Sequence, residues 1–282
     1  MSVRNIRLVL EFDGTAFHGW QRQSAARTVQ GVVEDAIASV FGARADVQGA
    51  GRTDAGVHAT GYVCNFHVAT ELPARRIRAA LAAHLSADVV VLEAEDAPVA
   101  FHARFGALAR RYAYRVSTVP TALQRHAVLV TPHALDAAAM ASGAVHLLGE
   151  HDFTSFTPAH NAADPVCRVA EAGVRREGPL VEITVEANRF LHHMVRVMAG
   201  TLVEVGRGRM GPERVGEILR KRDRRAAGPT APPCGLTFIG VRYPETGHDA
   251  PGADAGARDV LSSEPTRLES EGPNRPQEGK PR

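Results

Sequence analysis

Apolar and polar side chains alternate along residues 6–12, as they do in a strand with one buried face. Apolar residues then recur at helical spacing between Thr28, which can cap a helix, and Gly42, which can end one. Pro73 can open a second helix, which we expect to run to about His84. Strand patterns in this part of the chain also fall at 45–48, 61–68 and 89–92.

The following residues mix strands and helices in the same way. Residues 111–116 alternate again, which places Tyr112 and Tyr114 on one face of a strand. Further strands are predicted at 169–174, 180–186 and 235–241, the first two forming a hairpin around Gly178-Pro179. Helices are predicted at 135–148, at 189–205 and from Gly211-Pro212 onward. This order favours an α+β fold, with antiparallel sheets covered by helices on one side.

The same pattern suggests a division of the chain into three parts. Residues 1–104 and 105–244 each contain strands and helices, and we interpret them as two halves of the folded protein. Residues 245–282 consist mostly of Pro, Gly, Ser, Glu and Asp, with very few large apolar side chains. Such a segment buries too little surface to offset chain entropy, so we expect a disordered tail, to which we assign no function.

Composition bears on where the protein is located and on whether it uses a metal or a cofactor. No stretch of about 18 apolar residues exists, so we expect no membrane span. Residues 1–7 lack the apolar core of a signal peptide. The cysteines, Cys64, Cys167 and Cys234, are far apart and show no metal-ligand spacing. We therefore expect a cytoplasmic, reduced protein that uses neither a metal nor a cofactor.

Charge is distributed unevenly along the chain. Residues 244–282 carry a net charge of −3, which leaves +5 on the rest. A surplus of this size does not by itself establish a nucleic-acid partner. Basic residues do cluster, however, around Arg104, Arg110, Arg111 and Arg115, and again over 220–225.

One polar loop stands out between two of the predicted strands. Residues 49–58 hold three glycines, and between them lie Arg52, Thr53 and Asp54. A loop pinned between strands can hold a single carboxylate in a fixed place, as catalysis would require. The alternative is a structural turn in which Asp54 caps backbone amides.

A second group of polar residues falls on the helix predicted at 189–205. Arg189, His192, His193 and Arg196 are spaced so that they line one face of that helix, with no acid among them. Four donors without an acid suggest a face that meets an anion, and the alternative is a merely exposed basic face. Metal binding is disfavoured, because adjacent histidines on a helix point in different directions.

The loop segment Gly51–His58 resembles the catalytic motif of the tRNA pseudouridine synthase A family. Other stretches match that family in the expected order, at 12–14, 19–21, 101–105, 110–114, 152–156 and 187–196. The resemblance spans about residues 5 to 244. It implies two similar α/β halves that share an extended, mainly antiparallel sheet with helices on one side and a central RNA-binding cleft. It also implies a cofactor-independent isomerase that converts uridine to pseudouridine at positions 38, 39 and 40 of the tRNA anticodon stem-loop, working as a homodimer.

The resemblance assigns roles to four residues. Asp54 corresponds to the essential aspartate, which acts either as a nucleophile at C1′ or as a base at the sugar. Arg196 corresponds to its ion-pair partner, so we expect these two side chains to touch. Tyr112 corresponds to the tyrosine that stacks on the target base and could accept the C5 proton. Arg52 corresponds to the arginine that helps displace the target nucleotide.

Further cations are candidates for RNA contact. Phosphate affinity would come from Arg104, Arg110, Arg111, His192, His193 and the basic run at 220–225. The segment at 161–168 departs from the family pattern: Arg168 is retained, but the cation before it is missing. This departure puts RNA contacts from that loop in doubt.

Two other classes of protein compete with this interpretation. A non-catalytic RNA-binding module would keep the basic and aromatic residues without needing Asp54 beside Arg196. A metal-assisted hydrolase would need a cluster of acids and histidines on one face, and the sequence pattern shows none.

Overall fold

Ten strands and five helices form the part of the chain that the computed structural model describes, residues 2–158 and 164–244. The strands are β1 (Val3–Phe12), β2 (Gln48–Gly49), β3 (His58–Ala69), β4 (Val89–Ala97), β5 (Ala109–Ser117), β6 (Leu129–Val130), β7 (Gly149–Asp152), β8 (Val166–Glu177), β9 (Leu180–Ala187) and β10 (Leu236–Arg242). The helices are α1 (Val29–Phe41), α2 (Ala74–Ala82), α3 (Ala137–Val145), α4 (Met194–Gly206) and α5 (Arg214–Lys221).

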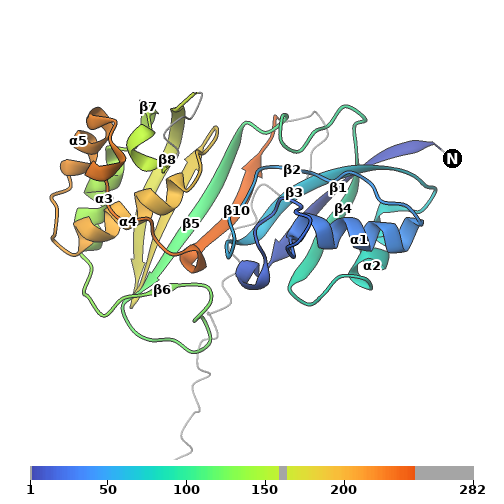
Figure 1. Cartoon of the computed structure of the whole chain (residues 1–282), viewed down its shortest axis with the longest axis horizontal. Coiled ribbons are helices and arrows are strands. Elements are labelled where there is room, and N and C mark those ends of the chain that lie inside the picture. The colour runs from blue at the N-terminus through green and yellow to red at the C-terminus, as the bar shows by residue number, and fades with distance from the viewer. Residues whose placement is uncertain (1, 159–163, 245–282) are drawn as a thin grey trace, which may run out of the picture. The chain divides into compact units, whose positions relative to one another are not determined.

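All ten strands belong to one sheet (Figure 1). The main order is β4-β1-β3-β10-β5-β9-β8-β7, with β2 added to β3 and β6 added to β5. Most pairs are antiparallel, and the parallel ones are β10 with β3 and β5 with β6. The last strand, β10, therefore lies between strands from the first and the second part of the chain. Met1–Pro244 form one compact unit.

The helices gather over two parts of this sheet. Figure 1 shows α1 and α2 beside β1, β3 and β4, and α3, α4 and α5 beside the strands from β5 to β8. Alternate residues of β1, from Ile6 to Phe12, are buried, as expected for a strand with one face in the core. Within the described residues, no helix is both long and apolar enough to cross a membrane.

The expected α+β class and the mostly antiparallel sheet are confirmed. Local signals also held at α1, where the Thr28 hydroxyl accepts a hydrogen bond from the Gly31 amide at 3.3 Å and Gly42 takes a left-handed conformation with φ of 76°. The predicted hairpin formed from β8 and β9, with Gly178 at φ of 54° in its turn. The boundary at residue 104 stays a prediction, and the expected disordered tail lies outside the described residues.

Two predicted elements began at least three residues too early. The strand expected at 45–48 is reduced to Gln48–Gly49. The helix expected from Arg189 begins only at Met194. The side-chain oxygen of Asn188 accepts hydrogen bonds from the amides of Arg168 and Arg189, each at 2.9 Å. This side-chain bond ties residue 189 to the end of the sheet, in competition with a helical start.

Candidate active site

The loop that carries Asp54 connects β2 to β3 and is braced by the segment that follows β1. The Trp20 amide donates to the Thr53 carbonyl at 3.1 Å, and the Gly56 amide donates to the Phe17 carbonyl at 3.2 Å. The Gly14 amide donates to Nδ1 of His58 at 3.1 Å. The stretches at 12–14 and 19–21, which the sequence showed only as motifs, therefore support the loop from behind.

Close packing explains two glycines of this supporting segment. A Cβ at Gly14 would lie 2.0 Å from the carbonyl oxygen of Val57. Gly19 has a φ of 86°, and a Cβ there would lie 2.4 Å from the Thr53 carbonyl oxygen. Any larger residue at either position would displace the loop, so these glycines help to fix the position of Asp54.

Three nitrogen-bearing side chains surround the Asp54 carboxylate. Nη1 of Arg196 lies 3.2 Å from Oδ2, and Nε2 of His193 lies 3.5 Å from the same oxygen. Nε2 of His192 lies 3.8 Å from Oδ1. The Asp54 side chain is 25% exposed, so the carboxylate is sheltered by these groups but still reachable from solvent.

Arg196 is itself held from a third segment of the chain. Its Nε donates to the carbonyl of Ala231 at 2.8 Å, and the Ala231 amide donates back to the Arg196 carbonyl at 3.0 Å. The guanidinium therefore joins the residues before β10 to the Asp54 loop. The predicted contact between Asp54 and Arg196 is confirmed.

The arrangement of the neighbouring basic residues differs from the prediction. Arg189, His192 and His193 precede α4, and His193 takes a left-handed conformation with φ of 57°. The two imidazoles stack with centroids 3.7 Å apart instead of pointing in different directions. Arg189 turns away and pairs with Asp164 at 2.8 Å. The anion that His192, His193 and Arg196 meet in this structure is Asp54 itself.

Asp54 and the two histidines are also side chains of types that bind metals. The ligand atoms of Asp54, His192 and His193 all lie within 4.8 Å of one another, and this donor set would suit zinc. Oδ2 of Asp54, however, already lies 3.2 Å from Nη1 of Arg196. Arg196 already supplies a positive charge. Partial burial lowers the pKa of His193, outweighing the opposing effect of Asp54, so the ring favours its neutral form.

Tyr112 lies among aromatic rings on the same side of β5 as Tyr114. It packs edge-on against Phe190 at 5.1 Å and Phe238 at 5.0 Å between ring centroids, and it is 8% exposed. Burial, reinforced by the charge of Asp54, raises the pKa of its phenol well above the ordinary value. The phenol is therefore neutral. Tyr114 is fully buried and donates its hydroxyl to the Pro232 carbonyl at 2.9 Å, so it packs in the core.

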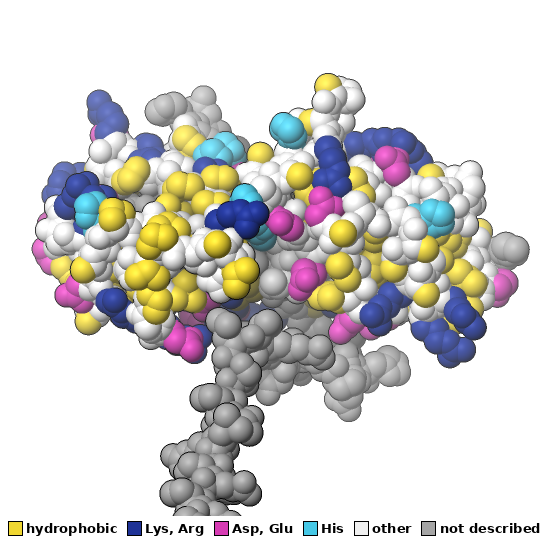
Figure 2. All heavy atoms as spheres, turned by 90° about the horizontal axis from the view of Figure 1, so that it is seen from below, with side chains coloured by type: hydrophobic (Ala, Val, Ile, Leu, Met, Phe, Trp, Pro, Cys, Tyr) yellow, Lys and Arg dark blue, Asp and Glu magenta, His cyan; other side chains and the backbone are white. Residues whose placement is uncertain are grey.

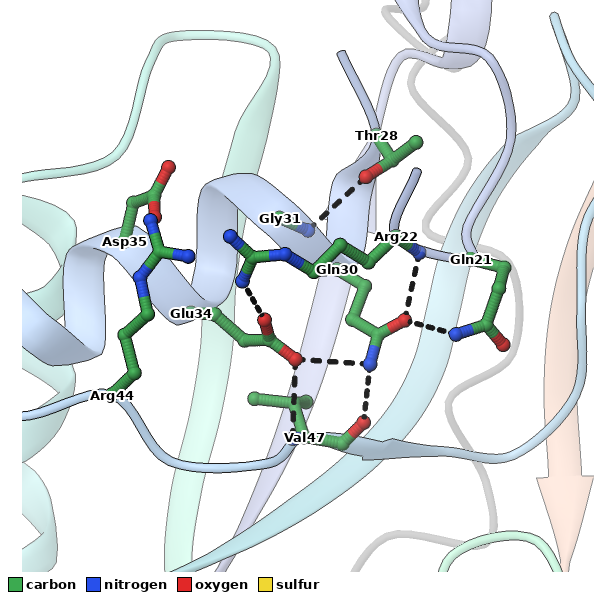
Figure 3. A network of polar contacts seen from close by, with 9 residues as sticks. All are labelled: Gln21, Arg22, Thr28, Gln30, Gly31, Glu34, Asp35, Arg44 and Val47. Atoms are coloured by element: carbon green, nitrogen blue, oxygen red, sulfur yellow. Dashed lines mark hydrogen bonds and ion pairs between the residues drawn. The ribbon is translucent and has the colours of Figure 1, made fainter. Parts of the chain in front are cut away.

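Arg52 is held by a chain of polar side chains that starts inside α1. Its Nε donates to Oε1 of Gln21 at 3.1 Å, and Nε2 of Gln21 donates to Oε1 of Gln30 at 2.8 Å. Nε2 of Gln30 in turn donates to Oε1 of Glu34 at 2.9 Å, and Glu34 also pairs with Arg22. Figure 3 shows this network from Gln21 to Glu34. It positions the side chain that the resemblance links to nucleotide displacement.

Sequence reasoning missed this network. Gln30 and Glu34 are both buried, although they lie on the helix that was identified by its apolar spacing. The available signal was their i, i+4 separation beside Val29 and Val33, since polar residues at core-facing positions require partners.

A small hollow lies beside Arg52. It has a volume of about 160 Å³, and its lining includes Trp20, Gln21, Gln48, Arg52 and Arg104. Two of the cations considered for RNA contact, Arg52 and Arg104, therefore border one cavity next to the loop that carries Asp54.

The other arginines named from the sequence lie in different surroundings. The Arg110 guanidinium donates to backbone carbonyls of Ala50, Arg104, Ala107 and Asn188. Arg111 follows one residue later on the strand, so it points to the opposite face of the sheet, where it pairs with Glu171 at 2.6 Å.

Three arginines of the basic run at 220–225 are also partnered within the protein. Arg222 pairs with Asp152, Arg224 donates to the Gly228 carbonyl, and Arg225 pairs with Asp223. On the face that Figure 2 displays, Lys and Arg side chains form separate groups with acidic and apolar side chains between them.

The fold and the site define an α+β protein in which an arginine and two histidines surround one carboxylate near a buried tyrosine. A family model described as tRNA pseudouridine synthase matches residues 8–106 and 144–244, and the chain belongs to that family. The members of the family are isomerases, and so is this chain.

Curated relatives match over most of their length. The tRNA pseudouridine synthase A of Methylobacterium nodulans is 45% identical over 250 residues, covering 87% of this chain and 98% of the relative. The protein of the same name from Paramagnetospirillum magneticum is 44% identical over 245 residues, covering 86% and 96%. That of Acetivibrio thermocellus is 39% identical over 244 residues, covering 86% and 100%.

Proposed function

We propose that this chain isomerises uridine to pseudouridine in tRNA, at positions 38, 39 and 40 of the anticodon stem-loop, with Asp54 as the essential carboxylate. The observation that carries the proposal is the contact of 3.2 Å between Asp54 and Arg196. Membership of the family and the names of the relatives support the reaction, and the motif resemblance supports the tRNA positions.

The reaction moves one bond without a net change in atoms. The N1–C1′ glycosidic bond breaks, the uracil turns, a C5–C1′ bond forms, and the proton on C5 is transferred to N1. Asp54 serves either as the nucleophile at C1′ or as the base at the sugar. Arg196 holds one carboxylate oxygen, which orients the other toward the substrate.

Tyr112 contributes mainly an aromatic surface for the base. Its raised pKa keeps the phenol protonated, so the ring can stack on or border the uracil, but it is a poor acceptor for the C5 proton. The target base must leave the RNA stack before Asp54 can reach C1′. Arg52 is held by Gln21 beside a cavity, and in this proposal it occupies the space that the base leaves.

We assign RNA contact to side chains at the cavity and beside the Asp54 carboxylate. These are Arg52 and Arg104 at the cavity and His192, whose side chain is 59% exposed. Arg110 supports the loop instead, and Arg111 faces the opposite side of the sheet. We also propose that the two halves enclose a central RNA-binding cleft, that two copies form a homodimer, and that the enzyme works in the cytoplasm.

Release of tritium from tRNA labelled at uracil C5 tests the reaction and the residue together. The wild type should release tritium, and Asp54→Asn should reduce the rate at least about a thousandfold, as removal of an essential nucleophile or base does. Asp136→Asn is the matched control, because Asp136 caps α3 and asparagine caps equally well.

Other outcomes would redirect the proposal. RNA binding without tritium release from any variant would favour a non-catalytic binding module. Release from wild type and Asp54→Asn alike would confirm the reaction and remove Asp54 from it. Light scattering that finds a monomer at working concentration would contradict the homodimer.

A further inference from the structure

A phenylalanine stands out on the turn between β4 and β5. Phe105 is 77% exposed, in contrast to the aromatic residues that pack around Tyr112. Its ring lies 4.4 Å from the His102 ring between centroids, and the Arg104 guanidinium lies 5.5 Å from its centroid. A single exposed apolar residue needs no explanation, so the inference depends on these neighbours and on how the turn is fixed.

The turn is anchored at its base. Ala103 is fully buried, its amide donates to Oδ1 of Asn65 at 2.9 Å, and its carbonyl accepts the Tyr243 hydroxyl at 2.7 Å. The Gly106 amide donates to the His102 carbonyl at 2.9 Å, which closes the turn. Several hydrogen bonds therefore fix the backbone that carries the exposed Phe105 ring. Because this backbone is already ordered, ligand binding costs little conformational entropy here.

One arginine ties this turn to the Asp54 loop. The Arg110 guanidinium donates to the Arg104 carbonyl on one side and to the Ala50 carbonyl, at 3.0 and 3.1 Å, on the other. The Arg104 side chain borders the same cavity as Arg52. Phe105 thus has a fixed place at the edge of the site, next to the cations assigned to RNA.

We propose that Phe105, with His102 and Arg104, forms a stacking site for an unpaired nucleobase of the RNA substrate, separate from the base that reacts. This inference rests on the proposed function. Proteins bind unpaired bases by stacking them on exposed aromatic rings with cations nearby for the phosphates. A loop whose target nucleotide is displaced offers such bases. Residues 101–108 contain no acid that would repel the RNA backbone.

Binding of anticodon stem-loop RNA to alanine variants tests the site. Phe105→Ala should weaken binding about tenfold, which is the size expected for losing one stacked base. Phe105→Trp should restore it, because tryptophan stacks at least as well. Leu123→Ala is the matched control, since Leu123 is 97% exposed in another loop, and it should bind as the wild type does. Fluorescence anisotropy of labelled RNA measures all four proteins.

The tryptophan variant also reports on the contact directly. Trp20 is the only natural tryptophan and is buried, so Phe105→Trp adds a single exposed indole. Its emission should be quenched when RNA is added in an Asp54→Asn background, which prevents turnover. Quenching by RNA at Leu123→Trp should be absent or much weaker.

The results separate this inference from the proposed function. Wild-type tritium release together with unchanged RNA binding by Phe105→Ala would overturn the stacking site alone. Indole emission that responds to protein concentration and not to RNA would assign Phe105 to a contact between two copies of the chain. That result would also overturn the stacking site. A wild type that neither releases tritium nor binds RNA would remove the proposed function and this inference together.

Discussion

Nη1 of Arg196 lies 3.2 Å from Oδ2 of Asp54, although 142 positions of sequence separate the two residues. The same guanidinium donates through Nε to the Ala231 carbonyl. Three segments therefore meet at one side chain: the loop before β3, the first turn of α4 and the approach to β10. The orientation of the Asp54 carboxylate therefore depends on the position of Arg196 as well as on the loop that carries Asp54.

Substitution of Arg196 should lower catalysis without unfolding the protein. Arg196→Ala frees the carboxylate to rotate, and misplacement of a catalytic group by about 1 Å can cost about 100-fold in rate. Arg196→Lys keeps the charge but loses the planar fork that reaches Asp54 and Ala231 together, so it should recover only part of the rate. Steady-state kcat and KM for tritium release measure both variants.

Two results would contradict this role. Full activity of Arg196→Lys would show that charge suffices and that the fork is not needed. A loss confined to KM, with kcat unchanged, would assign Arg196 to binding RNA and not to positioning Asp54.

The position of Gly14 yields a prediction about stability. A Cβ there would lie 2.0 Å from the Val57 carbonyl oxygen, so Gly14→Ala must displace β1 or the Asp54 loop. We expect a loss of about 1–3 kcal/mol in the free energy of unfolding, as for other overpacked sites. Gly51→Ala is the matched control, because a Cβ at Gly51 meets nothing within 4 Å. Urea unfolding of both variants measures the difference, and equal midpoints would contradict the prediction.

The sequence was informative where local rules decide the structure. Alternation predicted β1, and the cap at Thr28 with the stop at Gly42 bounded α1 closely. The start of α4 could not be found in this way, because helical spacing of apolar residues continues back through Leu191. The side-chain oxygen of Asn188 accepts hydrogen bonds from the amides of Arg168 and Arg189, which oppose that continuation. The first of these bonds depends on the neighbouring strand β8.

In the candidate site too, some features could be predicted from the local sequence and others depend on the fold. Asp54 could be singled out from its own loop, and its pairing with Arg196 followed from the resemblance. The stacking of His192 on His193 could not be foreseen, since it accompanies a left-handed backbone at His193 that no sequence pattern indicates. Gln30 and Glu34 were overlooked because the spacing of α1 was assessed only for its apolar members.

His193 should make stability depend on pH in a defined window. Its pKa in the folded protein lies below the ordinary value of 6.5, mainly because burial disfavours the imidazolium. The unfolded chain therefore binds the proton more readily, and stability should fall as the pH drops from about 6.5 toward the lower folded pKa. Below that folded pKa the contribution becomes constant.

A variant without the imidazole isolates this contribution. His193→Asn keeps a residue type that tolerates the left-handed backbone and removes the titrating ring. The wild type should lose more stability than the variant between pH 6.5 and 5, as measured by urea unfolding at several pH values. Parallel pH profiles for the two proteins would show that His193 does not contribute.

The last prediction concerns Gln21, whose Oε1 accepts the Arg52 Nε at 3.1 Å. If this hydrogen bond positions Arg52, Gln21→Ala should slow tritium release several-fold, and Arg52→Ala should slow it more. The double variant should then be no slower than Arg52→Ala alone, because Gln21 acts only through Arg52. Gln23→Ala provides the control, since Gln23 is exposed nearby and bonds only the His18 carbonyl in the described part of the chain. Additive losses in the double variant would mean that Gln21 contacts the RNA itself, and the network from Glu34 to Arg52 would then have a purely structural role.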